Sequence, residues 1–325
     1  MFEVIKPGLE TSVQDLPGRI GYWEQGFPPS GPVDMWSFRL ANLLVGNHRD
    51  AAALECQFLG PTLRFECDCH VAIAGADMGA ALDGTAIPSW RTLPVRAGQV
   101  LELSGARTGA RTYIAISGGI DTPLVLGSRS TFHMAGVGGV DGYALKAGQR
   151  IPIGRADAPP GLRAVAAGRR PAITSNREWS IEVMPGPNDS WLDQETIERF
   201  LSSEWTVQSK SSRTGMRLTG PAFGFSERAT NKLPEHGHDP SNILDHGYPL
   251  GAINLAGQTP IILINDAPST GGFINPFTVP SAAFWKLGQA RPGNVLRFRS
   301  VTLKEAQDLR RALDDICTAD SLVAV

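Results

Sequence analysis

Glycine and proline are the residues that most constrain the fold of this chain. The 325 residues include 36 glycines and 24 prolines, and segments with helical periodicity are few. Because both residues interrupt long regular elements, this composition favours short strands joined by many turns. The sequence therefore predicts a mainly β protein. Strands are expected in six apolar or alternating segments, at residues 71–74, 100–103, 111–116, 181–184, 260–264 and 295–299.

A few helices are expected among these strands. Asp34 stands where it can cap a helix that Gly46 ends. A second helix is expected over residues 190–202. A third should begin at Thr302, because Glu305 follows three residues later and completes a capping box.

One short phrase recurs along the chain. A small residue or proline, a glycine and an amide residue precede a short strand in AGQVLEL (97–103), AGQRIPI (147–153) and PGNVLRF (292–298). The first and third copies each close a stretch that begins with a glycine-proline signature, GPTLRF or GPAFGF. The pattern indicates an internal duplication, with two related β units in tandem.

The composition between these units predicts the domain boundaries. Residues 156–172 are rich in alanine, proline, glycine and arginine, as is typical of a linker. We therefore expect an N-terminal β domain over residues 1–155 and a C-terminal β domain with a terminal helix over residues 173–325.

Bulk properties exclude several classes of function. The net charge of −2 argues against nucleic-acid binding, which needs clustered positive charge. No apolar run approaches the roughly 20 residues of a membrane span, and the N-terminal sequence does not resemble a signal peptide, so a cytoplasmic location is expected. Four cysteines in a chain of this length do not make a disulfide framework.

Two groups of cysteine and histidine raise the question of a metal. Cys67 and Cys69 would point to one face of a strand and His70 to the other, which favours small buried hydrophobic residues over ligands. The looser group of His236, His238 and His246 lacks a second set of ligands at zinc spacing. No metal is therefore expected.

Polar groups, glycine and proline are concentrated in two neighbouring segments. Residues 237–248 read GHDPSNILDHGY, and residues 265–273 read NDAPSTGGF directly after the apolar run PIILI. A buried strand that delivers polar groups to a glycine-rich turn is a common way to present a binding site. The groups suit a small, polar, planar substrate. No lysine or hydroxyl residue follows the glycines at the spacing of a phosphate loop, so ATP binding by this chain is not expected.

Several separated motifs resemble one known family. In the first half they are TSVQDLPGRIG (11–21), PSGPVD (29–34), RLANLLVGN (39–47), ALE (53–55), GGID (118–121) and GSRST (127–131). In the second half they are PGP (185–187), SRTGMRLTG (212–220), the glycine pair 271–272 and GQARPG (288–293). Together they resemble the KipA family, also called allophanate hydrolase subunit 2, a biotin-dependent carboxyltransferase-like family. The resemblance covers about residues 1–310.

Two branches of that family differ in one loop. In the branch that resembles the KipA-like component of 5-oxoprolinase, this loop lacks the Pro-Ser-Asn sequence. In the carboxyltransferase domain of urea carboxylase it reads much like the HDPSNILD of residues 238–245. This chain is similar to the second branch over residues 235–290. It departs from urea carboxylase because it contains no biotin carboxylase module, no partner half of the transferase and no Met-Lys-Met biotinylation sequence.

The resemblance implies a fold, a reaction and partners. It implies two small cyclophilin-like β-barrels and a carboxyltransferase half that moves CO2 from carboxybiotin to urea or a related amide or guanidino nitrogen. Biotin would be carried on another chain, and the partners would be a KipI-like (subunit 1) protein, a biotin carboxylase and a biotin carboxyl carrier. Whether the chain acts alone is left open. The alternatives are a component of a 5-oxoprolinase and a non-enzymatic regulator that binds a KipI-like protein.

Three residues are candidates for the chemistry. Asn242 offers both a donor and an acceptor to the carbonyl and NH2 groups of urea, although an Asx turn would also explain it. Asp245 can accept a hydrogen bond from a substrate NH2 group or orient Asn242, or it is a loop cap. Arg217 can supply positive charge for an anionic product or carboxybiotin, or it pairs with a structural carboxylate.

Six further residues are candidates for substrate binding. Tyr248 can cover the substrate or simply pack. Arg213 has the same two interpretations as Arg217, and Asp34 can be a helix cap. The glycines at 271 and 272 allow either close approach of a ligand or a positive φ. The full set of expected binding residues is Ser241, Tyr248, Arg213, Asp266, Ser30 and Asp34.

Overall fold

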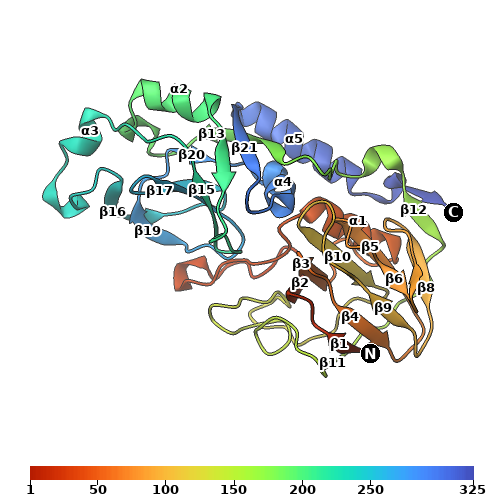
Figure 1. The fold of residues 1–325 in the computed structure, drawn as a ribbon. Helices are drawn as coiled ribbons and strands as arrows, with labels where there is room; N and C mark the ends of the chain where they lie inside the picture. The colour runs from red at the N-terminus through yellow and green to blue at the C-terminus, as the bar shows by residue number, and fades with distance from the viewer. The chain divides into compact units, whose positions relative to one another are not determined.

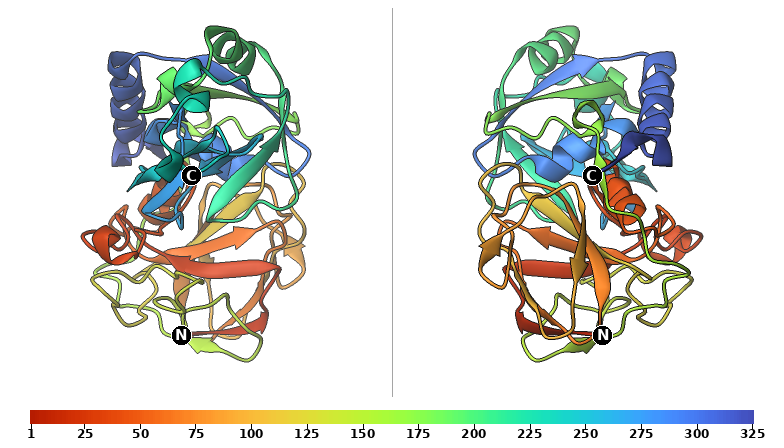
Figure 2. Two further views of the ribbon diagram at one scale, coloured as in Figure 1. Left: turned by 90° about the vertical axis from the view of Figure 1, so that its left-hand side faces the viewer. Right: turned by 90° about the vertical axis from the view of Figure 1, so that its right-hand side faces the viewer.

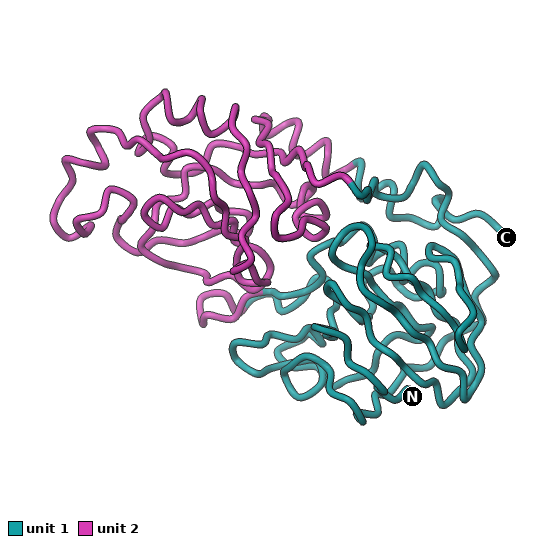
Figure 3. The backbone as a smooth tube through the Cα atoms, viewed as in Figure 1, with its two compact units in different colours: residues 1–21, 29–175, 312–325 teal, residues 22–28, 176–311 magenta.

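The chain forms two compact units. The computed structural model describes residues 1–325. The first unit comprises residues 1–21, 29–175 and 312–325, and the second comprises residues 22–28 and 176–311 (Figure 3). Most residues lie in strands and loops, with few helices (Figure 1), so the mainly β prediction is confirmed. None of the helices is both long and apolar enough to cross a membrane.

The division of the chain differs from the expected boundaries at its C-terminal end. Residues 312–325 belong to the first unit, because β22 (Leu322–Ala324) pairs with β12 (Arg163–Val165). Strand β12 itself lies inside the segment for which the composition predicts a linker. The sequence contains no hint of this pairing, since both strands are only three residues long.

Two antiparallel sheets form the first unit. The six-stranded sheet has the order β11-β1-β4-β9-β6-β7 and the five-stranded sheet the order β2-β3-β10-β5-β8; both can be followed from two further sides in Figure 2. The strands of the first sheet are β1 (Phe2–Lys6), β4 (Thr62–Phe65), β6 (Ala81–Leu82), β7 (Thr85–Ala86), β9 (Val100–Glu102) and β11 (Arg150–Ile151). Those of the second are β2 (Glu10–Gln14), β3 (Ala53–Gln57), β5 (Cys69–Gly75), β8 (Thr92–Val95) and β10 (Arg111–Ile116).

Strand β10 shows why the first unit has two cores. All six of its residues are buried. Ile114 and Ile116 point to the core shared with the six-stranded sheet. Tyr113 and Ala115 point to the other face, where they pack with Phe38 of helix α1 (Met35–Leu44). Because side chains alternate along a strand, one central strand covers both cores.

The second unit is built on a closed barrel. Its strands follow the order β13-β20-β17-β18-β15-β14-β21 and close on themselves. They are β13 (Glu178–Pro185), β14 (Trp205–Val207), β15 (Gly215–Thr219), β17 (Ala252–Ala256), β18 (Thr259–Leu263), β20 (Phe277–Thr278) and β21 (Val295–Ser300). A separate two-stranded antiparallel sheet, β16 (Asn242–Gly247) with β19 (Thr270–Phe273), lies outside the barrel. The helices are α2 (Gln194–Ser202), α3 (Glu227–Thr230), α4 (Phe284–Gln289) and α5 (Leu303–Ile316).

The expected elements appear where the sequence predicts them. Each of the six predicted strands overlaps an observed strand, and β10 matches its prediction at both ends. The Asp34 carboxylate caps α1 by accepting from Ser37 N (3.0 Å). The capping box of α5 forms as well, with Thr302 N donating to Glu305 Oε2 (2.7 Å) and Glu305 N donating to Thr302 Oγ1 (3.2 Å).

Aromatic packing joins helix α2 to the barrel. The ring of Phe200, 1% exposed, stacks on Phe277 at 4.1 Å and on Phe298 at 4.5 Å between ring centroids. Phe277 and Phe298 lie on β20 and β21. One helix side chain therefore contacts two strands of the barrel wall.

We predict that Phe200→Ala costs the chain about 3–5 kcal/mol of unfolding free energy, because it leaves a cavity among stacked rings. Urea denaturation measures the loss. Leu233→Ala, at a site 62% exposed, is the control and should change stability by less than about 0.5 kcal/mol. Equal effects of the two substitutions would contradict the role assigned to the aromatic cluster.

Candidate functional site

A cavity of about 350 Å³ opens on the barrel wall of the second unit. Residues of β15, β17, β18 and β19 and of the adjoining loops line it. The polar residues are Lys210, Ser212, Thr214, Arg217, Tyr248, Asn254 and Thr270, and the apolar ones are Ile261, Leu263, Pro268 and Phe273. No acidic residue is among the lining residues. A volume of this size accommodates a small organic ligand.

Two cations give the cavity a positive charge. Arg217 lies on β15 with its side chain exposed. Its backbone N–H donates to Ser211 Oγ (3.1 Å) and its carbonyl accepts from Gln208 N (2.9 Å), whereas its guanidinium has no hydrogen-bond or ion-pair partner. Lys210 is likewise exposed at the cavity. With no carboxylate among the lining residues, the cavity is suited to an anionic group.

Tyr248 and Asn254 form the buried polar part of the cavity lining. Tyr248 is 4% exposed, and its hydroxyl oxygen accepts a hydrogen bond from Phe273 N (2.6 Å). Burial raises the pKa of the Tyr248 hydroxyl above its usual 10.0, while the hydrogen bonds from Phe273 N and the Asn254 side chain act in the opposite direction. Asn254, 3% exposed, retains an amide oxygen without a partner.

The glycine pair has a packing explanation. Neither Gly271 nor Gly272 has a positive φ. A Cβ on Gly271 would lie 2.7 Å from Cε2 of Tyr248, and one on Gly272 would lie 2.9 Å from the Ile243 carbonyl oxygen. Both glycines therefore let β19 approach β16 and the Tyr248 ring closely. Both also line the cavity, so their backbone remains available to a ligand.

The Pro-Ser-Asn loop is held by its own polar groups. The Asp239 carboxylate accepts from Ser241 N (2.8 Å) and from the Ser241 hydroxyl (2.7 Å), and that hydroxyl accepts from Gly257 N (3.0 Å). Ser241 is fully buried. Its side chain is thus occupied in holding the turn. The Asx-type contact is made by Asp239, before the proline, and not by Asn242, for which an Asx turn was the alternative.

The side chain of Lys232 stabilises the same loop through hydrogen bonds to its backbone. Lys232 Nζ donates to the carbonyl oxygens of Asp239 and Asn242, the latter at 2.6 Å, and lies 5.6 Å from the ring centroid of Trp191. The Asn242 side chain is half-buried and Asp245 is exposed, and neither is among the residues that line the cavity. Sequence reasoning did not single out Lys232, because its role depends on carbonyl groups seven and ten residues away.

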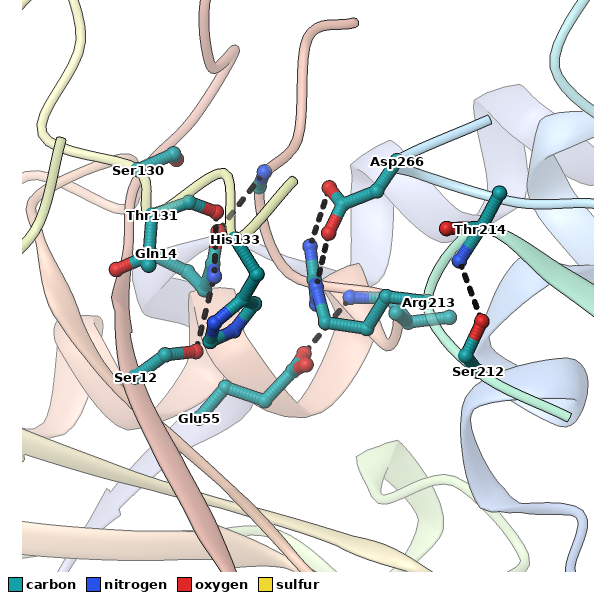
Figure 4. A network of polar contacts seen from close by, with 12 residues as sticks. Ser12, Gln14, Glu55, Ser130, Thr131, His133, Ser212, Arg213, Thr214 and Asp266 are labelled. Carbon is teal, nitrogen blue, oxygen red and sulfur yellow. Dashed lines mark hydrogen bonds and ion pairs between the residues drawn. The ribbon is translucent and has the colours of Figure 1, made fainter. Parts of the chain in front are cut away.

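Arg213 and Asp266 form a buried ion pair. Arg213 Nε donates to Asp266 Oδ2 at 2.9 Å and Arg213 Nη2 to Asp266 Oδ1 at 3.2 Å, with both side chains 4% exposed (Figure 4). The backbone adds a bond from Asp266 N to the Arg213 carbonyl (2.9 Å). The fork-shaped pairing joins the loop before β15 to the loop after β18 and lies outside the cavity lining.

The candidates of the first unit are buried. Asp34 is fully buried as the cap of α1, with the Ser37 hydroxyl donating to Oδ2 at 2.6 Å. Ser30 is 3% exposed and adopts a left-handed φ of 59°. The adjacent Gly31 N donates to Gln14 Oε1 (3.0 Å), and Gln14 Nε2 donates to the Ser12 hydroxyl (3.0 Å; Figure 4).

A carboxylate joins two family motifs in the first unit. Asp15 accepts from the hydroxyls of Ser128 (2.5 Å) and Ser130 (2.6 Å) and from Arg129 N (2.7 Å). These contacts connect the QDLPG segment to the GSRST segment. The spacing of the two motifs along the sequence contains no sign of this contact.

Cysteine and histidine side chains do not assemble a metal site. No group of three or more His, Cys, Asp or Glu side chains is placed to hold an ion. Two of the histidines have local partners instead: His236 Nδ1 accepts from Leu244 N (3.2 Å), and His246 Nε2 lies 3.1 Å from the Phe273 carbonyl oxygen.

Two lining residues, Lys210 and Asn254, were missed by sequence reasoning. Asn254 stands between apolar residues in Ala252–Ala256, and an amide in a buried strand is the one signal that could have drawn attention to it. Lys210 carries no such signal, since a lysine in a polar turn is ordinary.

Comparison with known proteins gives a consistent result. Residues 25–300 match the family model described as "Carboxyltransferase domain, subdomain A and B". The chain is 40% identical to the urea amidolyase of Lachancea kluyveri over 323 residues, which are 96% of this chain and 18% of that protein. It is 37% identical to a 5-oxoprolinase subunit of Escherichia coli over 314 residues, which are 96% of this chain and 94% of that protein.

A solved structure agrees with these sequence matches. The crystal structure of the Kluyveromyces lactis urea carboxylase superposes with a TM-score of 0.92 at 38% identity, covering 100% of this chain and 30% of that one. The chain thus spans less than a third of these two urea-acting relatives, and almost the whole of the E. coli relative.

The bond between Tyr248 and Phe273 gives a first prediction for this site. Tyr248→Phe removes the acceptor of the Phe273 N–H, so the amide hydrogen of Phe273 should exchange with solvent about tenfold faster. Hydrogen-exchange mass spectrometry of residues 242–247 and 270–273 measures this. Tyr143→Phe, at a tyrosine 50% exposed in the first unit, is the matched control. Unchanged exchange at Phe273 would contradict the anchoring role of the hydroxyl.

The Asp239 turn gives a second prediction, on pH. Hydrogen bonds from the Ser241 hydroxyl and backbone hold the pKa of the Asp239 carboxyl below its usual 3.8. Because the folded-state pKa is lowered, this stabilisation is present above pH 3.8 and is lost as the pH falls through the folded-state pKa.

The stability difference between the wild type and Asp239→Asn should therefore shrink as the pH is lowered from 6 to about 3. Urea midpoints across that range measure the difference. Asp245→Asn, at an exposed side chain of the same segment, is the matched control. A difference between wild type and Asp239→Asn that is independent of pH would contradict the prediction.

Proposed function

This chain belongs to the carboxyltransferase domain family, subdomains A and B, and from that premise we propose that it is one half of the carboxyltransferase of a biotin-dependent carboxylase. The acceptor that we propose is urea or a related amide or guanidino nitrogen. The biotin carboxylase, the biotin carrier and a KipI-like partner half lie outside the 325 residues, and we place the assembly in the cytoplasm.

The cavity of the second unit is the observation that carries this proposal. It combines two cations without carboxylate partners, an amide and a tyrosine hydroxyl from buried residues, and glycine backbone. A carboxylated ureido group presents the complementary set, a carboxylate beside N–H and carbonyl groups. The residues present therefore fit carboxybiotin or a carboxylated urea.

When bound, carboxybiotin supplies CO2 and a basic ureido group. The work of this chain is to orient, to hold charge and to exclude water. Arg217 and Lys210 would balance negative charge on a carboxylate or oxyanion. Tyr248, Asn254 and the backbone at Gly271 would fix the plane of the ligand.

The Arg213–Asp266 pair has a different role. If either side chain changed partner, the other would remain as an unpaired buried charge, which would destabilise the fold. We therefore assign this pair to holding the loops of the site, rather than to contacting the substrate.

Asn242 and Asp245 remain proposed substrate contacts rather than cavity residues. Both lie on β16, which pairs with β19 and ends one residue before Tyr248. The register pairs Asn242 with Phe273, a lining residue. Asn242 would offer its amide to the carbonyl and NH2 groups of urea, and Asp245 would accept from an NH2 group. Their position on β16 next to the cavity supports these roles.

A second candidate, a 5-oxoprolinase component, has one observation in its favour. The E. coli 5-oxoprolinase subunit aligns with this chain over 94% of its own length, whereas the urea-acting relatives are far longer. The HDPSNILD sequence of residues 238–245 favours urea.

The decisive experiment is reconstitution with a KipI-like subunit, biotin carboxylase and biotinylated carrier, following ADP release. We expect urea to stimulate ATP turnover. Arg217→Met should reduce the stimulated rate about a hundredfold, because an electrostatic contact to developing charge is lost. Asn242→Ala should reduce it as well, by about tenfold or more. Arg311→Met, at an exposed helical arginine outside the cavity, is the matched control and should leave the rate unchanged.

Other outcomes assign other functions. Stimulation by 5-oxoproline and not by urea would favour the oxoprolinase component. A complex that forms with the KipI-like protein but responds to neither compound would favour a regulatory protein. Urea stimulation that survives both Arg217→Met and Asn242→Ala would keep the reaction and overturn the assigned site.

A further inference from the structure

The first unit holds a second cavity, of about 520 Å³. The β6–β7 hairpin, the residues before β8, the loop before β10 and the segment 170–173 surround it. All of its lining residues belong to the first unit. The proposed carboxyl transfer uses none of these residues, so this cavity needs its own explanation.

Arg170 contributes a positive charge that the protein does not neutralise. Its Nε and Nη2 both donate to the Val165 carbonyl oxygen, at 3.0 and 2.7 Å, which fixes the orientation of the guanidinium. No carboxylate pairs with it. Burial lowers the pKa of Arg170, and the positive charge of the nearby Arg91 lowers it further. An arginine side chain nevertheless stays protonated in a protein, so Arg170 carries its positive charge in unfavourable surroundings. A bound anion would relieve this cost.

Arg107 adds a second cation with a weak partner. Its Nη1 lies 3.7 Å from Asp77 Oδ2, and both side chains are more than half exposed. The other oxygen of Asp77 accepts from Gly79 N (2.8 Å), so this carboxylate also serves to hold its turn. Asp77 is the one acidic residue in the lining, against two arginines. The cavity therefore has a net positive charge.

Beside the polar Ser89 and Thr108, the lining contains an aromatic residue and an apolar side. Trp90 is held at both backbone groups: its N–H donates to the Ile73 carbonyl (2.7 Å) and its carbonyl accepts from Val165 N (2.9 Å). Ile87, Pro171 and Ile173 complete an apolar wall. Trp90 and Arg170 thus both form hydrogen bonds with the backbone of Val165. This shared residue fixes the aromatic and the cationic parts of the cavity relative to each other.

We propose that this cavity is a binding site for a small organic anion, a carboxylate or a phosphate monoester that carries a flat apolar group. Arg170 and Arg107 bind the anionic head, and Trp90, Ile87 and Pro171 contact the apolar body. A planar guanidinium suits carboxylate and phosphate oxygens equally, so the two head groups share one chemistry here. The site is independent of the proposed transfer reaction.

Pairs of ligands that differ only in charge test the proposal directly. The full-length chain is titrated with benzoate and with benzamide, its neutral isostere, and then with phenyl phosphate and with inorganic phosphate. Binding is measured by calorimetry and by saturation-transfer NMR. We expect benzoate or phenyl phosphate to bind at least about tenfold more tightly than benzamide. The stronger of the two identifies the preferred head group. Inorganic phosphate, which lacks the apolar body, should bind more weakly than phenyl phosphate.

Substitutions locate the site. Arg170→Gln and Arg107→Gln should each weaken binding about tenfold or more, whereas Arg96→Gln, at an exposed arginine outside the cavity, should not. Arg107 is 67% exposed, so its substitution remains informative even if Arg170→Gln destabilises the fold. Equal binding of benzoate and benzamide, or equal loss in all three variants, would overturn the proposal.

Discussion

The parallel pairing of β13 with β21 is the constraint on which the second unit depends. Six consecutive residue pairs, from Glu178 with Val295 to Val183 with Ser300, join the first and last strands of the barrel. Every other strand pair of the barrel is antiparallel. The closure removes the open edges that a sheet of seven strands would otherwise expose. It also holds β15, β17 and β18 side by side as a rigid wall, and the cavity opens on that wall.

Polar residues in the second unit have two distinct uses. Around residues 239–242 nearly every polar group is occupied: Ser241 binds Asp239 and Gly257, and Lys232 binds two carbonyl oxygens. At the cavity, by contrast, Arg217 has a free guanidinium and Asn254 an amide oxygen without a partner. Since buried polar groups are normally paired, the unpaired amide oxygen of Asn254 marks where a ligand is expected, and the exposed Arg217 guanidinium lines the same cavity. The loop that is richest in polar residues thus supports the site, and the adjoining wall supplies the groups that face it.

In the first unit, too, some polar residues hold the structure together and others border a cavity. Asp15, Asp34 and Gln14 are buried and occupied by loops and helix ends. Arg170 and Arg107 instead border a cavity with a net positive charge. Family motifs such as QDLPG and GSRST therefore have a structural explanation in this unit, whereas the residues around its cavity belong to none of the motifs that indicated the family.

The sequence by itself determined the local elements and the family. Gly and Pro spacing, the Asp34 cap, the Thr302–Glu305 capping box and alternating strands such as β10 are encoded within a few residues, and all of them form. The sequence also pointed to Tyr248 and Arg217, which line the cavity. Only the tertiary structure decided that Lys210 and Asn254 join them, that Gly271 accommodates a tyrosine ring, and that residues 322–324 return to the first unit. Those facts depend on contacts between residues far apart in the chain, and local propensity carries no information about such contacts.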